Sequence, residues 1–61
     1  SNTTVLYHLA SLYARLHEKE KAVEKLQEAV ENGYNNWRHL KTDKDLENIY
    51  DTAYYQNLLQ R

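Results

Sequence analysis

The sequence predicts an all-α fold of four or five helices, and three features of its first half support that class. Apolar residues recur in steps of three and four along two successive stretches, which is the spacing of one face of an α-helix. The polar segment His17–Lys21 between them is too short for anything except a tight reversal. Gly33 follows the second stretch, where a helix end favours a residue free to adopt a left-handed backbone conformation. Two antiparallel neighbouring helices are therefore expected.

The composition limits the classes of protein to which the chain can belong. Its 61 residues provide room for one small domain, and a domain of this size buries only about 60% of the surface that its unfolded form exposes. The chain lacks cysteine and carries a net charge of −1 in mixed sign along its length. These features exclude disulfides and argue against nucleic acid or an anionic membrane as a partner. They are compatible with a cytoplasmic protein.

The chain is expected to be a piece of a longer protein, because it contains no methionine. Residues 1–2 are interpreted as a remnant of tag cleavage. No apolar run approaches the ~18 residues of a membrane span.

The first helix is expected to follow Thr3 or Thr4, both capable N-caps, and to end near Leu16. Its small Ala10 would let a second helix approach closely. The expected buried stripe is Leu6, Leu9, Tyr13 and Leu16, with Val5 and Leu12 beside it.

A different face of this first helix is the candidate partner-binding surface. It combines one aromatic and one arginine with small side chains, and Tyr and Arg are enriched among binding hot spots. A solvated flank with a tyrosine over its edge is the alternative interpretation. The candidate face consists of Thr4, Tyr7, Ser11, Ala14 and Arg15.

The second helix is expected to run from about Lys19 to Asn32, with a mixed-charge face toward solvent. Its apolar positions are Ala22, Val23, Leu26, Ala29 and Val30.

Seven residues of the two helices follow the spacing of a known repeat: Leu6, Leu9, Ala10, Tyr13, Ala22, Leu26 and Ala29. This pattern resembles the tetratricopeptide repeat, a unit of about 34 residues, and the resemblance covers residues 3–36. It implies a close-packed helix pair that binds or scaffolds other proteins without catalysis. The sequence departs from the family at Tyr34, where proline is usual, so a further standard repeat is not expected to follow.

Residues 37–61 are expected to form short capping helices. Asn35 or Asn36 can cap a helix that holds Trp37 and Leu40. Thr42, followed by acidic residues, has the pattern of a second N-cap.

A last helix can begin after Asp51 or Thr52, and one continuous helix from Asp43 to Gln60 is the competing interpretation. This half resembles the segment that closes tetratricopeptide arrays in many bacterial proteins. The resemblance implies a terminal cap, which covers the apolar face that a stack of repeats leaves open.

No catalytic, cofactor or metal site is predicted. His8, His17 and His39 do not pair with another ligand residue at a recognised spacing. The segment Asp43–Glu47 begins like a calcium loop but lacks the glycine and the closing glutamate of that motif. Gly33 is the single glycine, so there is no glycine-rich phosphate loop.

The expected function is a non-catalytic protein–protein interaction module that forms the terminal repeat of a helical array. Such a module would hold a protein or peptide partner, stack on preceding repeats, or self-associate through the exposed side of its first helix, around Val5 and Leu12. The alternative is a structural or dimerisation appendage of a larger bacterial enzyme or regulator, with no ligand of its own.

Overall fold

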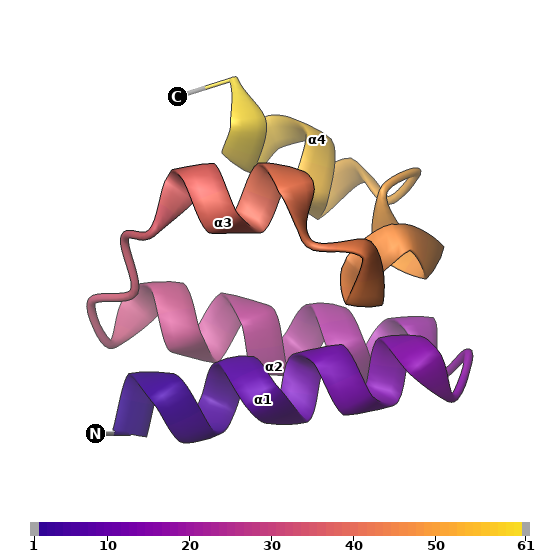
Figure 1. Ribbon diagram of the computed structural model, residues 1–61, viewed down its shortest axis with the longest axis horizontal. Coiled ribbons are helices and arrows are strands. Elements are labelled where there is room, and N and C mark those ends of the chain that lie inside the picture. The colour runs from indigo at the N-terminus through magenta and orange to yellow at the C-terminus, as the bar shows by residue number, and fades with distance from the viewer. Residues whose placement is uncertain (1, 61) are drawn as a thin grey trace.

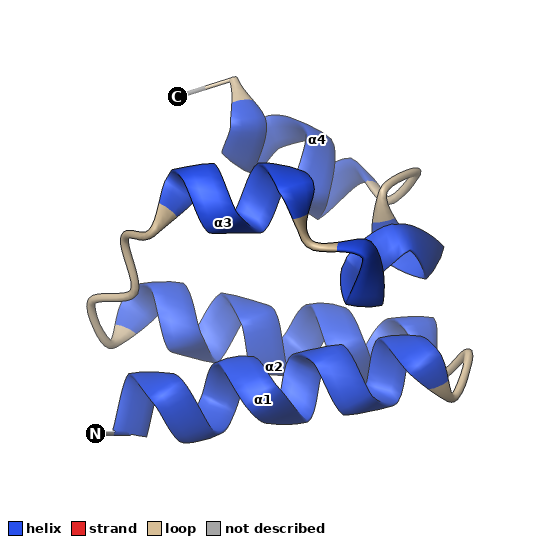
Figure 2. Ribbon diagram, viewed as in Figure 1, coloured by secondary structure: helices blue, strands red, loops and turns tan. Residues whose placement is uncertain are grey.

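The fold is all-α, as predicted. The computed structural model describes residues 2–60, and within that range it contains four α-helices, one 3-10 helix and no strand (Figure 2). The elements are α1 (Asn2–Arg15), α2 (Lys19–Glu31), α3 (Trp37–Thr42), η1 (Lys44–Ile49) and α4 (Ala53–Leu59). Of the expected tag remnant, Ser1 lies outside the described residues, whereas Asn2 begins α1.

Two layers make up the molecule. Helices α1 and α2 run antiparallel side by side, and α3, η1 and α4 lie across one side of this pair (Figure 1). Ala10, Ala22 and Ala29 are fully buried, and their small side chains permit the close approach of the paired helices. The second layer is held to the first by η1, which contacts both α1 and α2.

The end of α1 uses a histidine where a glycine is more usual. The N–H of His17 donates to the Ala14 carbonyl at 3.0 Å, and the N–H of Glu18 donates to the Tyr13 carbonyl at 2.8 Å. This pair of hydrogen bonds is the Schellman pattern, which needs a left-handed residue after the helix. His17 supplies that conformation with φ of 62°.

The end of α2 repeats this geometry with the predicted residue. Gly33 has φ of 107°, its N–H donates to the Val30 carbonyl at 3.0 Å, and the next N–H, of Tyr34, donates to the Ala29 carbonyl at 3.0 Å. The prediction that Gly33 ends the second helix in the left-handed region is therefore confirmed.

Two of the predicted N-caps in the second layer are confirmed. The Asn36 side chain accepts a hydrogen bond from the His39 N–H at 3.2 Å at the start of α3. The Thr52 side chain accepts one from the Tyr55 N–H at 3.4 Å at the start of α4. The interruption between Ile49 and Ala53 shows that one continuous helix to Gln60 is wrong.

The other predicted caps are wrong. Thr3 and Thr4 lie inside α1. Thr42 is the last residue of α3, and its hydroxyl donates to the Arg38 carbonyl at 3.1 Å. Asp43 caps η1 instead, because its Oδ1 accepts a hydrogen bond from the Asp45 N–H at 2.9 Å.

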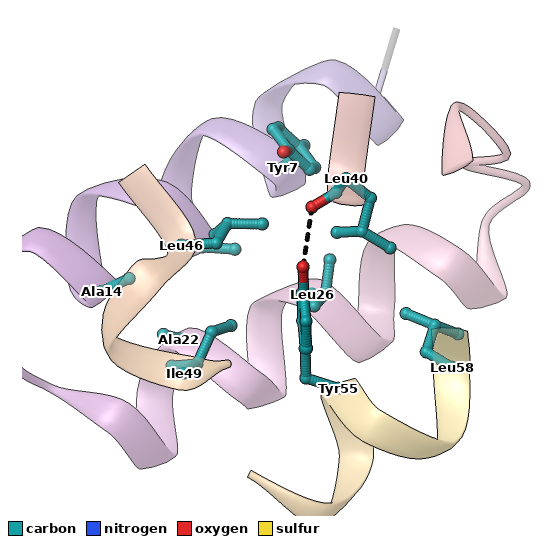
Figure 3. Close-up of a cluster of buried hydrophobic side chains, with 10 residues drawn as sticks. Tyr7, Ala14, Ala22, Leu26, Leu40, Leu46, Ile49, Tyr55 and Leu58 are labelled. Atoms are coloured by element: carbon teal, nitrogen blue, oxygen red, sulfur yellow. Dashed lines mark hydrogen bonds between the residues drawn. The ribbon is translucent and has the colours of Figure 1, made fainter. Parts of the chain in front are cut away.

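The hydrophobic core lies between the two layers (Figure 3). Leu26 from α2 meets Leu40 and Leu46 from the second layer there, and all three are fully buried. The Tyr55 hydroxyl donates to the Leu40 carbonyl at 2.9 Å, which pairs a polar group inside the core.

The buried side of α1 differs from the predicted stripe. Tyr7, Ala10 and Ala14 are buried, and Leu16 is 68% exposed. Leu6, Leu9 and Tyr13 are half-buried. The stripe prediction favoured the largest apolar residues, but the second layer covers the face that carries Tyr7 and Ala14, so these side chains take core positions.

Candidate interaction surfaces

An open hollow of about 340 Å³ lies between α1 and the second layer. We call it the α1–η1 hollow. Its lining comes from Tyr7, His8, Ser11, Leu12, Arg15, His39, Asp43 and Asp45. Residues 36 positions apart in the chain are thus brought to one site, which no local pattern indicates.

The structure brings together three of the five predicted partner-binding residues. Tyr7, Ser11 and Arg15 line the α1–η1 hollow. Thr4 is exposed outside its lining. Ala14 is fully buried in the core, so its assignment to a binding face was wrong. The reason is that Asn48 of η1 reaches α1 here and donates to the Ala14 carbonyl at 2.7 Å.

Tyr7 also differs from the prediction, because it is a core residue with only 6% of its surface exposed. Its hydroxyl donates to Asp43 Oδ2 at 2.6 Å. Its ring stacks on Tyr34, with ring centroids 4.6 Å apart. Burial, and then the hydrogen bond to Asp43, raise the pKa of Tyr7 well above its ordinary range. Tyr7 therefore ties the two layers together as a neutral hydrogen-bond donor.

Asp43 is the polar centre of the hollow. Its Oδ2 accepts from Tyr7 and lies 3.3 Å from His39 Nε2, and its Oδ1 caps η1. The His39 ring lies 5.5 Å from the Tyr7 ring, at a tilt of 47°. These contacts fix the wall of the hollow in one arrangement.

The rim of the hollow offers charged groups to a partner. Arg15 and Asp45 are exposed, and neither side chain forms an ion pair with another residue of the range 2–60. The Ser11 hydroxyl donates to the His8 carbonyl at 2.9 Å, which leaves its oxygen able to accept. A polypeptide crossing the hollow can pair with a cation, an anion and a hydroxyl.

A second surface is apolar and follows one side of α1. Val5, Leu12 and Leu16 are 58%, 50% and 68% exposed, and they are the large apolar side chains that residues 2–60 leave most open. Their spacing of seven and four residues puts them on one helical face. We call them the apolar stripe. Its exposure agrees with the prediction for Val5 and Leu12, and Leu12 also borders the α1–η1 hollow.

A third surface was missed by sequence reasoning. A hollow of about 350 Å³ between α3 and α4 is lined by Trp37, Lys41, Leu58 and Leu59. We call it the α3–α4 hollow. The one signal that pointed toward it is the four-residue spacing of Trp37 and Lys41, which sets an aromatic and a cation side by side on a short helix.

No group of three or more His, Asp or Glu side chains within residues 2–60 is placed to hold a metal ion. Among the helices described, none has both the length and the apolar character needed to cross a membrane.

Comparison with known proteins gives one weak relation. The chain is similar to a chloroplast protein of Arabidopsis thaliana, with 27% identity over 55 residues. The aligned segment is 90% of this chain but only 16% of that protein. No protein-family model matches the sequence, and no solved structure matches it. The similarity therefore assigns neither a family nor an activity to this chain.

Proposed function

We propose that this chain is a protein–protein interaction module that forms the closing unit of a tetratricopeptide-like helical array. One observation carries the proposal, namely the asymmetry of the α1–α2 pair. The second layer covers one side of the pair (Figure 1), while the apolar stripe is exposed on α1. Stacked helical repeats bury such a face against the preceding unit and need an atypical last unit to cover the final face.

The apolar stripe supports contact with another polypeptide more strongly than three isolated side chains would. Single exposed apolar residues are ordinary on protein surfaces. Here Val5 and Leu12 share one face of the fourteen-residue α1, and Leu16 directly follows that helix. Burying that face would remove apolar surface from water at roughly 25 cal/mol per Å².

The α1–η1 hollow supports a second contact within the same function, the holding of a peptide. Arg15 and Asp45 are charged groups without an ion pair in the described range, and Ser11 lies beside Arg15 on α1. Tyr7 is excluded as a direct probe of peptide binding because its removal would disturb the core.

The stacking contact can be tested by fusing a designed tetratricopeptide helix pair of known stability ahead of Thr3. We expect one cooperative thermal transition for both parts, because stacked units share interface energy. The variant with Leu12→Ser and Leu16→Ser should separate the transition into two. Glu24→Ser, an exposed change on α2, is the matched control and should keep one transition. Independent melting of the unaltered fusion would contradict the proposal.

The dimerisation alternative uses the same stripe and makes a different prediction. It requires the unfused 61-residue chain to form a dimer in sedimentation equilibrium, and the Leu12→Ser, Leu16→Ser variant to be monomeric. A chain whose mass does not depend on concentration, together with a cooperative fusion, would leave the closing-unit proposal standing and remove the alternative.

A further inference from the structure

The α3–α4 hollow has the chemistry of a binding site, and it is separate from the α1–η1 hollow. Residues two positions apart on an α-helix point to nearly opposite sides. His39 faces the α1–η1 hollow, and its neighbours Trp37 and Lys41 line the α3–α4 hollow. Helix α3 therefore separates two recesses that a partner would enter from different sides.

The floor of the α3–α4 hollow is apolar and anchored in the core. Leu58 is 5% exposed and belongs to the central core cluster, while Trp37 and Leu59 are half-buried against that cluster. In Figure 3 Leu58 points from α4 toward the core, on the side where Leu40 lies. A recess with a fixed aromatic and aliphatic floor can hold one apolar side chain of a partner, in the manner of an interface hot spot.

The two helices that form this hollow carry positively charged side chains and no negatively charged ones. Helices α3 and α4 together contain Arg38 and Lys41 but no aspartate or glutamate. Both cations are exposed, and neither forms an ion pair within the part of the chain that the structure describes. By contrast, all three lysines of α2 are in ion pairs: Lys19 with Asp51, Lys21 with Glu18, and Lys25 with Glu28. A carboxylate beside the hollow can therefore pair with Lys41 and Arg38, because neither cation has an acidic partner in the described chain.

We propose that the α3–α4 hollow binds an acidic peptide segment, which inserts an apolar side chain between Trp37 and Leu59 and presents a neighbouring carboxylate to Lys41 and Arg38. A second copy of this chain fits less well. Of the three large apolar side chains that it exposes most, Val5 and Leu12 lie on α1, which contains no acidic residue, and Leu16 directly follows that helix. This site does not depend on stacking through the apolar stripe.

The test is a titration of the isotope-labelled chain, followed by two-dimensional NMR. The probe is a terminally blocked ten-residue peptide of Asp, Glu and Ser with a central Phe-Leu pair. Two matched peptides serve as comparisons, one with Lys in place of the acids and one with Ser in place of Phe-Leu. We expect saturable shifts at the Trp37 indole and at Lys41 and Leu59 with the first peptide, and at least about tenfold weaker binding for the other two.

Two charge reversals separate a specific site from general attraction. Lys41→Glu should weaken binding of the acidic peptide by about tenfold. Lys44→Glu makes the same change of charge at an exposed position outside the hollow and should alter the affinity by about twofold or less. Far-UV circular dichroism of both variants establishes that each remains folded.

Several outcomes would overturn the assignment. These are no shift with the acidic peptide, shifts at His8 and Arg15 instead, equal losses from the two charge reversals, or equal binding of the Lys peptide. Shifts at Trp37 that depend on chain concentration without peptide would assign the hollow to a second copy and also overturn the proposal. None of these results affects the fusion experiment, so the two proposals fail independently.

Discussion

The two sides of α1 differ in what covers them, and this difference explains which side chains of the helix belong to the core. On one side Tyr7, Ala10 and Ala14 are buried, and Tyr7 and the Ala14 carbonyl are hydrogen-bonded to Asp43 and Asn48 from the second layer. On the other side, each residue of the apolar stripe has at least half of its surface exposed to solvent, and Leu16 is the most exposed. The helix therefore buries one tyrosine and two alanines and leaves Val5 and Leu12 uncovered.

This contrast teaches that cover, and not side-chain size, decides which face of the helix becomes core. Alanines allow η1 to approach the backbone of α1, where Asn48 can reach a main-chain carbonyl. Leucines at those positions would hold η1 away. The leucines on the open side then remain available for a partner.

The largest expected effect is on the free energy of unfolding, when leucine is truncated to alanine at a covered position and at an open one. Leu46→Ala removes a fully buried side chain of η1 and should lower the free energy of unfolding by about 2–5 kcal/mol. Leu16→Ala should change it by about 0.5 kcal/mol or less. Guanidinium unfolding followed by circular dichroism measures both, and equal losses would contradict the assignment of the two sides.

Alkaline pH should produce the next largest effect. Burial raises the pKa of Tyr55 to about 12, and burial with the hydrogen bond to Asp43 raises the pKa of Tyr7 further. Unfolded tyrosines lose their protons near pH 10. The stability contributed by these protonated hydroxyls is therefore complete below about pH 10 and is lost as the pH rises through about 12 and beyond.

Denaturant midpoints measured from neutral pH upward, together with tyrosinate absorbance, test this dependence. The chain with Tyr7→Phe and Tyr55→Phe is the control and should show a smaller decline. A midpoint that stays constant through pH 12, or buried tyrosines that titrate near pH 10 in the folded chain, would be inconsistent with it.

Tyr7→Phe should have a smaller effect than truncation of the core. The change removes the 2.6 Å hydrogen bond to Asp43 and keeps the ring that stacks on Tyr34. Hydrogen bonds to charged groups contribute about 1.5–3 kcal/mol, so a loss at the lower end of that range is expected. Tyr13→Phe is the matched control on the same helix and should change the unfolding free energy by about 0.5 kcal/mol or less. Chemical denaturation of the two variants should separate them clearly; indistinguishable curves would mean that the Tyr7 hydroxyl does not join the layers.

The smallest expected effects come from the residues that end α1 and α2, because these residues act through backbone conformation and not through the cover of α1. His17→Gly should raise the unfolding free energy by about 0.5–1 kcal/mol, since glycine adopts φ of 62° without a Cβ clash. Gly33→Ala should lower it by about 1 kcal/mol, and the strain comes from φ alone because no atom lies within 4 Å of an added Cβ. Thermal melts that shift in the same direction for both variants would refute this account.

Much of the fold could be predicted from the sequence because it depends on neighbouring residues. The turn after the first helix, Gly33 at the end of the second, and the caps Asn36 and Thr52 each use interactions within a few positions along the chain. The predicted end of the second helix at Asn32 differs by one residue from the observed end at Glu31.

The sites could be predicted only in part because they depend on contacts between distant residues. Tyr7 is of a residue type that is enriched among binding hot spots, but its hydroxyl donates to Asp43, 36 positions away in the chain. The α3–α4 hollow requires Leu58 to fold back against the helix of Trp37. Helical periodicity gives the relative angles of side chains on one helix, and it carries no information on which angle another helix will cover.

The Asp43 carboxylate limits what position 43 can become. One oxygen closes the first turn of η1, and the other receives the Tyr7 hydroxyl beside His39. Asparagine would offer a single acceptor oxygen for these two duties, and glutamate would push both oxygens one methylene farther from the backbone. A substitution that preserves only the charge or only the shape would therefore lose one of these two hydrogen bonds. Few residues can replace Asp43, in natural variation or in redesign.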